Sequence, residues 1–208
     1  MKAEEARPVA GIECVAFLVI ALASCATAPP VTNMPQITVG NYPQSEKFDL
    51  KVDLQLSEEL RSAIWHIDTV GVIQLGMQLT HNAETVAGLL FADVAVTQGA
   101  TAPPMESVDA ILIPRLIYAE QISPPLTFSW SQRPVLLTVI LEWTLKSRNG
   151  NLIWVDTVEG KSNTAYASVG DVIRVLDNLF RESFRSISSA QAIKEFATRK
   201  RTEQRERL

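Results

Sequence analysis

His66 and Asp68 are the side chains of this sequence that could belong to a catalytic relay. A histidine titrates near neutral pH, and a nearby carboxylate can orient its imidazole ring. No local pattern places a serine or a third group beside this pair, so the sequence favours a hydrogen-bonded structural histidine. A hydrolase that uses His66 would need a serine or carboxylate within hydrogen-bond reach in the folded protein. His81 lies off the apolar stripe of its expected helix and is predicted to be a surface residue.

Three carboxylates, Glu142, Asp156 and Glu159, come near one another in an expected hairpin and could provide a pair for acid–base chemistry. The register counted from the turn places Glu142 opposite Thr157 and points Asp156 to the other face of the sheet. Because the two side chains lie on opposite faces, no shared acid–base site is expected. The sequence also contains no phosphate-binding loop, no Gly-x-Ser-x-Gly elbow and no His-Glu-x-x-His motif. It therefore predicts no catalytic residue, no metal site, no cofactor and no enzymatic activity.

Cys25 stands at the end of an apolar run near the N-terminus. From Cys14 to Ser24, eleven side chains are apolar or small. At about 1.5 Å per residue, this run spans only about half of the hydrocarbon core of a bilayer. It is too short for a transmembrane helix and is typical of a signal peptide. An ordinary secretory signal, or a buried strand that ends in cysteine, would be the alternatives.

Leu22, Ala23, Ser24 and Cys25 resemble the lipobox of bacterial lipoproteins, in which a branched apolar residue and two small residues precede the modified cysteine. The resemblance implies cleavage between Ser24 and Cys25. It also implies a diacylglycerol thioether on Cys25, usually with an added N-acyl chain such as palmitate. Several acyl chains hold a protein on a membrane as one chain cannot, since each buried methylene contributes about 0.8 kcal/mol.

The residues around the lipobox carry two further implications. Ala26 follows the cysteine, whereas an aspartate there would favour retention in the inner membrane of proteobacteria. The resemblance therefore implies a periplasm-facing outer-membrane protein if the source is Gram-negative, and a cell-membrane lipoprotein otherwise. In one respect the chain departs from the pattern, because the acidic residues of the first segment offset Lys2 and Arg7, whereas a signal peptide normally begins with net positive charge.

Composition excludes several classes of protein. The 208 residues include 19 Lys and Arg against 23 Asp and Glu, a net charge of −4, and 47% of them are hydrophobic. This apolar content can form a core. Charged residues make up 20% of the chain with a near-neutral balance, which argues against global disorder and against nucleic-acid binding. Two cysteines cannot form a disulfide framework. We therefore expect one domain with appendages.

Two segments rich in proline lie outside the expected core. Residues 25–46 contain four prolines and are predicted to be an extended tether, able to hold the domain tens of ångströms from the membrane. Alternatively, Ile37 to Val39 could pair at the edge of a sheet. Residues 123–134 contain three prolines and place Leu126, Phe128 and Trp130 at alternating positions. These three side chains are candidates for contact with a partner or a lipid surface. Alternatively, the aromatic rings cover the core of the domain itself.

Hydrophobic periodicity predicts the elements of the domain. Strands are expected at 48–56, 92–97 and 108–117, with Pro114 disfavouring a fully paired position. A helix is expected at 74–91, and the preceding stretch 57–73 stays ambiguous apart from one helical turn at 57–64. A hairpin is expected at 134–162 around a type I′ turn at Asn149–Gly150. Ser168 and Asp171 form a predicted capping box for a helix at 171–187, and a last helix follows from Ala190.

The order of elements predicts an α+β fold: a single two-layer domain with a mixed, mostly antiparallel sheet and both helices on one face. The sequence divides into a signal peptide (1–24), a lipidated cysteine with a tether (25–46), an α+β domain (47–197) and a polar charged tail (198–208). The pattern over roughly 47–196 loosely resembles small envelope lipoproteins of the YajG-like and curli-assembly kinds.

The resulting functional hypothesis is a non-enzymatic, membrane-anchored module that contacts an envelope protein and could form homo-oligomers. The alternative is a lipid- or glycolipid-handling accessory lipoprotein of an envelope transport system, which would need an apolar cavity between the sheet and the helices. The charged tail could be a solvated helix end or a basic patch for anionic lipid or glycan.

Overall fold

The computed structural model describes residues 31–32, 34, 42, 45–98, 108–123 and 135–206. They belong to one compact unit, Val31–Leu208. The predicted signal peptide, Ser24 and Cys25 lie outside the described residues, as do Leu126, Phe128 and Trp130.

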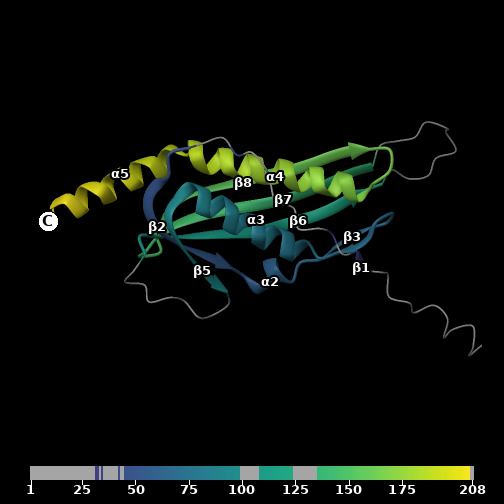
Figure 1. The fold of residues 1–208 in the computed structure, drawn as a ribbon, viewed down its shortest axis with the longest axis horizontal. Helices are drawn as coiled ribbons and strands as arrows, with labels where there is room; N and C mark the ends of the chain where they lie inside the picture. The colour runs from purple at the N-terminus through teal and green to yellow at the C-terminus, as the bar shows by residue number, and fades with distance from the viewer. Residues whose placement is uncertain are drawn as a thin grey trace, which may run out of the picture. The chain divides into compact units, whose positions relative to one another are not determined.

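A five-stranded sheet forms the centre of the unit, with the strand order β5-β2-β6-β7-β8 (Figure 1). β2 (Phe48–Leu56) runs parallel to both of its neighbours, β5 (Phe91–Gln98) and β6 (Ala110–Ile122). β6, β7 (Val135–Ser147) and β8 (Leu152–Thr164) are antiparallel to one another. The predicted α+β class with a mixed sheet is therefore confirmed.

The β7–β8 hairpin has the predicted register. Leu141 lies opposite Val158, and Trp143 lies opposite Asp156, as counted from the sequence. Alternate residues of β7 from Leu137 to Leu145 are fully buried, which confirms the predicted apolar face. Trp143 donates a hydrogen bond from Nε1 to Ser183 Oγ (2.9 Å), so its polar atom is satisfied inside the core.

The turn of this hairpin differs from the prediction. The N–H of Ser147 donates to the carbonyl oxygen of Asn151 (2.7 Å), and the N–H of Gly150 donates to the carbonyl oxygen of Ser147 (2.8 Å). The connection therefore has three residues, 148–150, and the predicted two-residue type I′ turn is wrong. Gly150 has φ of +83°, a conformation that glycine adopts without strain. A bulge at Ile153 adds one residue to β8 and so restores the register that a two-residue turn would have produced.

Pro114 occupies a position where β6 has one partner. β6 pairs with β2 only from Ala110 to Leu112, whereas its pairing with β7 continues to Ile122. Pro114 lies beyond the β2 ladder, opposite Trp143, where its missing N–H breaks no central hydrogen bond. This confirms the prediction that Pro114 avoids a fully paired position.

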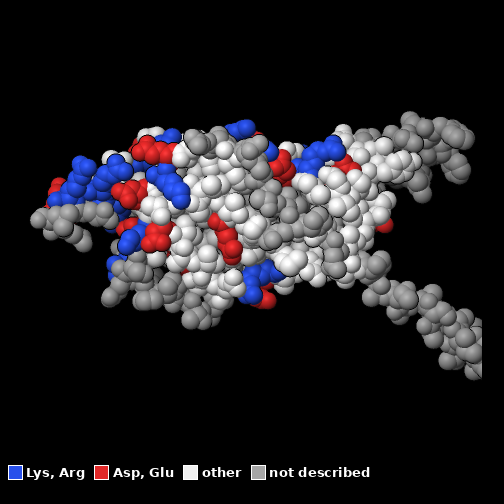
Figure 2. Space-filling view, viewed as in Figure 1, with Lys and Arg blue, Asp and Glu red and all other residues white. Residues whose placement is uncertain are grey.

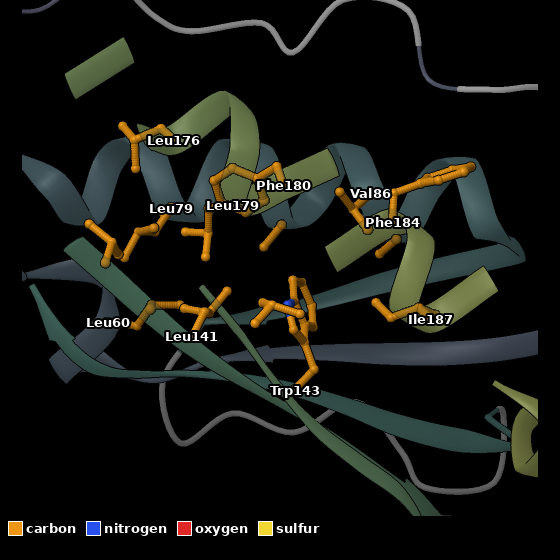
Figure 3. Packing of buried hydrophobic residues seen from close by; sticks show 14 of the residues in the cluster. Leu60, Leu79, Val86, Leu141, Trp143, Leu176, Leu179, Phe180, Phe184 and Ile187 are labelled. Carbon is orange, nitrogen blue, oxygen red and sulfur yellow. The ribbon is translucent and has the colours of Figure 1, made fainter. Parts of the chain in front are cut away.

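Two helices cover one face of the sheet. α3 (Leu75–Leu90) and α4 (Val169–Ser189) pack their apolar stripes against it. Figure 3 shows Leu79 and Val86 of α3 and Phe180 of α4 above Trp143 of β7. Both helices lie where the hydrophobic periodicity predicts them.

The N-terminus of α4 carries the predicted capping box. Ser168 Oγ accepts a hydrogen bond from the N–H of Asp171 (3.2 Å), and Asp171 Oδ2 accepts one from the N–H of Ser168 (3.1 Å). The hydrogen bonds from Ser168 and the nearby Arg174 guanidinium lower the pKa of Asp171, although its burial acts in the opposite direction.

The stretch 57–73, for which the sequence predicts only one helical turn, forms α2 (Glu58–Arg61) and two strands of a second sheet. This sheet has three short strands in the order β1-β4-β3: β1 (Val31–Thr32), β4 (Gly71–Ile73) and β3 (Trp65–Ile67). Trp65 is buried, as expected of a core tryptophan. β1 belongs to the predicted tether, and it pairs in parallel with β4. Five residues, 26–30, thus separate Cys25 from the first described strand.

The last helix, α5 (Gln191–Glu206), follows α4 after Ala190, as predicted. It begins with buried Ile193 and Phe196 and continues through most of the charged tail. Among the described helices, none is both long and apolar enough to cross a bilayer.

Candidate interaction surfaces

The face of the sheet opposite α3 and α4 carries apolar side chains. On β7, every second residue from Leu136 to Thr144 points away from the buried Trp143 side, and their partners on β6 and β8 share that orientation. We call this the outer sheet face and define it by the apolar residues Ile113, Tyr118, Ile122, Leu136, Ile140 and Val155.

Three residues of the outer sheet face expose large parts of their side chains. Tyr118 is 43% exposed, Ile122 48% and Val155 47%. The face also has a polar element, since Arg115 Nε lies 3.9 Å from Glu142 Oε1. This pair lies between the row of Ile113 and Val155 and the row of Tyr118 and Ile140, so charged and apolar side chains alternate on this face. Clustered, exposed apolar side chains on one face of a sheet mark a candidate protein–protein contact surface.

A second surface lies at the end of the molecule where α5 begins. Figure 2 shows Lys and Arg gathered over α5 with acidic residues among them. A cavity of about 560 Å³ lies between this helix and the β7–β8 turn, lined by Arg148, Arg199 and Lys200 but also by Asp109 and Glu203. Lys200 Nζ lies 2.9 Å from Glu203 Oε2. The mixed signs of charge favour a solvated surface over a dedicated anion site.

The possible histidine relay is not assembled among the described residues. His66 is exposed on β3, opposite Val72. The Asp68 carboxylate instead accepts a hydrogen bond from Gln121 Nε2 (2.8 Å), and Gln121 Oε1 accepts one from the N–H of Asp68 (3.0 Å). His81 is half-buried on α3. The Asp68 carboxylate, which the relay would need beside His66, is therefore hydrogen-bonded to Gln121.

The three hairpin carboxylates have separate partners, and Glu142 and Asp156 lie on opposite faces of the sheet, as expected. Glu142 lies opposite Thr157 and near Arg115, on the outer sheet face. Asp156 lies on the helix side, where it accepts a hydrogen bond from Ser186 of α4. Glu159 pairs with Lys161 (2.7 Å). Within the described ranges, no group of three or more His, Cys, Asp or Glu side chains could hold a metal ion.

Asp53 is a buried acid on β2, at a position where the apolar–polar alternation of residues 48–56 predicts exposure to solvent. It is 2% exposed. Asp53 Oδ1 accepts a hydrogen bond from Thr97 Oγ1 of β5 (2.7 Å), and its Oδ2 accepts one from Gln55 Nε2 (2.9 Å). The alternation of residues 48–56 predicts a solvent-exposed position for Asp53, and this prediction is wrong. The burial depends on β5, a partner strand that is far away in the sequence.

The helices close tightly on the sheet. Val172, Leu176 and Phe180 of α4 are fully buried. Where α4 crosses β8, a Cβ added to Gly160 would lie only 2.2 Å from the carbonyl oxygen of Val175. The backbones of α4 and β8 therefore approach too closely at this crossing to leave room for a methyl group. The lipid-handling alternative would need an apolar cavity there.

No protein-family model matches the chain, and no curated protein matches its sequence. Among solved structures, it is similar to a DUF330-family protein of Xanthomonas campestris, with 10% identity and a TM-score of 0.47 over 85% of this chain and 97% of that one. It is also similar to a minor lipoprotein of Acinetobacter baumannii (14% identity, TM-score 0.38, 67% and 93% of the two chains). A third similar structure is the PelC dodecamer of Paraburkholderia phytofirmans (16% identity, TM-score 0.38, 70% and 92%). These values assign the chain to no family.

Proposed function

We propose that this chain is a non-enzymatic lipoprotein, anchored to a bacterial membrane through acylated Cys25, that acts as an interaction module in a cell-envelope complex. The observation that carries the proposal is the lipobox, Leu22–Cys25, at the end of a short apolar run and ahead of a single folded domain. In a Gram-negative source the absence of aspartate after Cys25 favours the outer membrane, with the domain facing the periplasm.

The interaction role is supported by the outer sheet face. Tyr118 and Val155 keep nearly half of their surface in solvent although both belong to strands that are paired with β7. An aromatic and a β-branched side chain so placed are suited to burial against another protein. The partner-contact loop proposed from the sequence, with Leu126, Phe128 and Trp130, connects β6 to β7, two strands that form this face.

The first experiment measures the intact mass of the protein purified from bacterial membranes. We expect the mass of residues 25–208 plus acyl groups for the natural chain. Cys14→Ser is the matched control, because Cys14 lies in the cleaved segment, and it should leave this mass unchanged. Cys25→Ser should abolish acylation. An unmodified full-length mass in the soluble fraction would contradict the anchor.

The second experiment tests the interaction surface in the same membranes. A photoreactive benzoylphenylalanine replaces Tyr118, or as a control Met77, which is 59% exposed on α3, the helix side of the domain. We expect a discrete protein adduct from position 118 and little from position 77. Equal adducts from both positions, or none from 118, would refute the outer sheet face as an interface.

A further inference from the structure

The predicted tether contacts the domain at several points along its length. Val31 and Thr32 pair with Val72 and Ile73 of β4, and Thr32 Oγ1 donates to the carbonyl oxygen of Val70 (2.5 Å). Further along the chain, the ring of Tyr42 lies 4.9 Å from that of Phe184 on α4. Lys47 Nζ donates to the carbonyl oxygen of Gly88, near the end of α3 (2.6 Å). Among the described residues of this part of the chain, Val31, Thr32, Tyr42 and Lys47 therefore contact the domain.

β1 lies at a defined end of the domain. The turn between β3 and β4 is joined to the end of β6 through the Asp68–Gln121 hydrogen bonds. It is joined to the segment after β8 by Thr69 Oγ1, which donates to the carbonyl oxygen of Ala167 (2.5 Å). We call this the β1 end and define it as residues 31, 67–71, 121–123 and 164–167. In Figure 1, β1 and β3 lie on the opposite side of the view from α5.

The length of chain before Val31 limits how far the β1 end can stand from the membrane. Six residue steps separate Cys25 from Val31. At 3.3–3.6 Å per step, they span at most about 20 Å. β7 alone has 13 residues and measures about 40 Å, so the β7–β8 turn and the start of α5 lie beyond this reach when the β1 end is at the bilayer.

The side chains of the β1 end have the chemistry of a membrane-contacting surface. Tyr166 is 66% exposed, Val31 53% and Ile122 48%. The charged side chain among the residues that define this end is Asp68, which is bonded to Gln121. A tyrosine combines an apolar ring with a hydroxyl and is suited to the boundary between acyl chains and headgroups. The basic residues of α5 and Arg148 lie at the opposite end, by the β7–β8 turn.

We propose that the β1 end faces the membrane and that Tyr166, Ile122 and Val31 contact its lipid surface, while α5 points away from it. The proposal rests on the proposed acylation of Cys25. The occupant of this apolar end is lipid because the five-residue connection, 26–30, holds it beside the bilayer that contains the acyl chains. The outer sheet face other than Ile122, together with α5, then remains available to partners in the envelope.

The test uses the full chain in bacterial membranes with benzoylphenylalanine in place of Tyr166. The matched control carries it in place of Leu152, which is 61% exposed at the opposite end, beside the β7–β8 turn. Intact mass of each sample first establishes acylation. After irradiation, we expect at least fivefold more phospholipid adduct from position 166 than from position 152.

The outcomes separate the two proposals. Acylated protein with lipid adducts from 166 and few from 152 supports the orientation. Acylated protein with no lipid adduct from 166, or with equal adducts from both positions, overturns the orientation and leaves the lipoprotein proposal intact. Protein without acyl groups overturns the lipoprotein proposal and the orientation with it.

Discussion

Gly160 lies where α4 crosses β8, and no side chain larger than a hydrogen atom fits there. Gly160→Ala would place a methyl group against the carbonyl oxygen of Val175 and Cβ of Leu179. We expect a loss of roughly 2 kcal/mol in the free energy of unfolding. Gly88→Ala is the matched control, because a Cβ there meets nothing within 4 Å, and alanine in α3 should raise stability by about 0.5–1 kcal/mol. Urea unfolding of both variants checks this, and equal effects would contradict the close crossing of α4 and β8.

Asp171 gives a prediction that depends on pH. Its pKa is lower in the folded than in the unfolded protein, so its ionised form stabilises the fold above the usual aspartate range, near pH 4. This stabilisation is lost as the pH falls through the folded-state pKa. Asp171→Asn should therefore lower the free energy of unfolding by about 1 kcal/mol at pH 7. The difference should narrow below about pH 4.

Chemical unfolding at pH 7 and at pH 3 measures that difference. Asp49→Asn is the control, since Asp49 belongs to an exposed pair with Arg201 (3.5 Å) and should matter little at either pH. A destabilisation by Asp171→Asn that stays constant with pH would show that the charge of the capping box contributes nothing.

At the scale of elements, the packing of Tyr42, a residue of the predicted tether, on α4 can be tested directly. The Tyr42 hydroxyl is buried and has no hydrogen-bond partner among the described residues, and burial raises its pKa above the usual value of 10. Tyr42→Phe should therefore leave stability unchanged or slightly raised. Tyr42→Ala removes the ring that packs on Phe184 and should cost about 3 kcal/mol. If both variants unfold like the natural chain, this segment does not pack on α4.

The elements that the sequence predicts are the long periodic ones. Residues 48–56 alternate over a whole strand, and the stripes of α3 and α4 repeat over four turns or more, so burial alone determines their type. β1, β3 and β4 have two or three residues each, too few to show a period. The turn at Asn149–Gly150 was misjudged because a three-residue connection with a bulge produces the same register as a two-residue turn.

Of the candidate functional features, some can be identified from the sequence and others only from the fold. Cys25 can be identified from sequence because its processing enzymes recognise a short, contiguous segment. The outer sheet face cannot, because which of Ile113, Tyr118 and Val155 stays exposed depends on strands that come together only in the fold. The burial of Asp53 depends likewise on Thr97, a residue of another strand.

At the scale of the whole molecule, the short connection before Val31 should control the distance to the membrane. Insertion of twenty Gly and Ser residues between Thr27 and Ala28 adds roughly 25 Å of average reach. We expect the lipid adduct from position 166 to fall severalfold, because the effective concentration of the β1 end at the bilayer falls with linker length. The adduct yield relative to the unextended chain, at equal acylation, is the measurement. An unchanged yield would mean that the β1 end binds lipid without help from the anchor.

The contact between Tyr42 and Phe184 also has a consequence in time. It joins the beginning of the domain to a helix near its end. An exported chain appears amino end first, so residues 31–47 would reach the membrane surface long before the helix on which Tyr42 packs is made. Acylation would then precede folding, and the late docking of Tyr42 would draw the finished domain toward an anchor already in place. For such a protein, the last folding step is also the step that brings the folded domain to the bilayer.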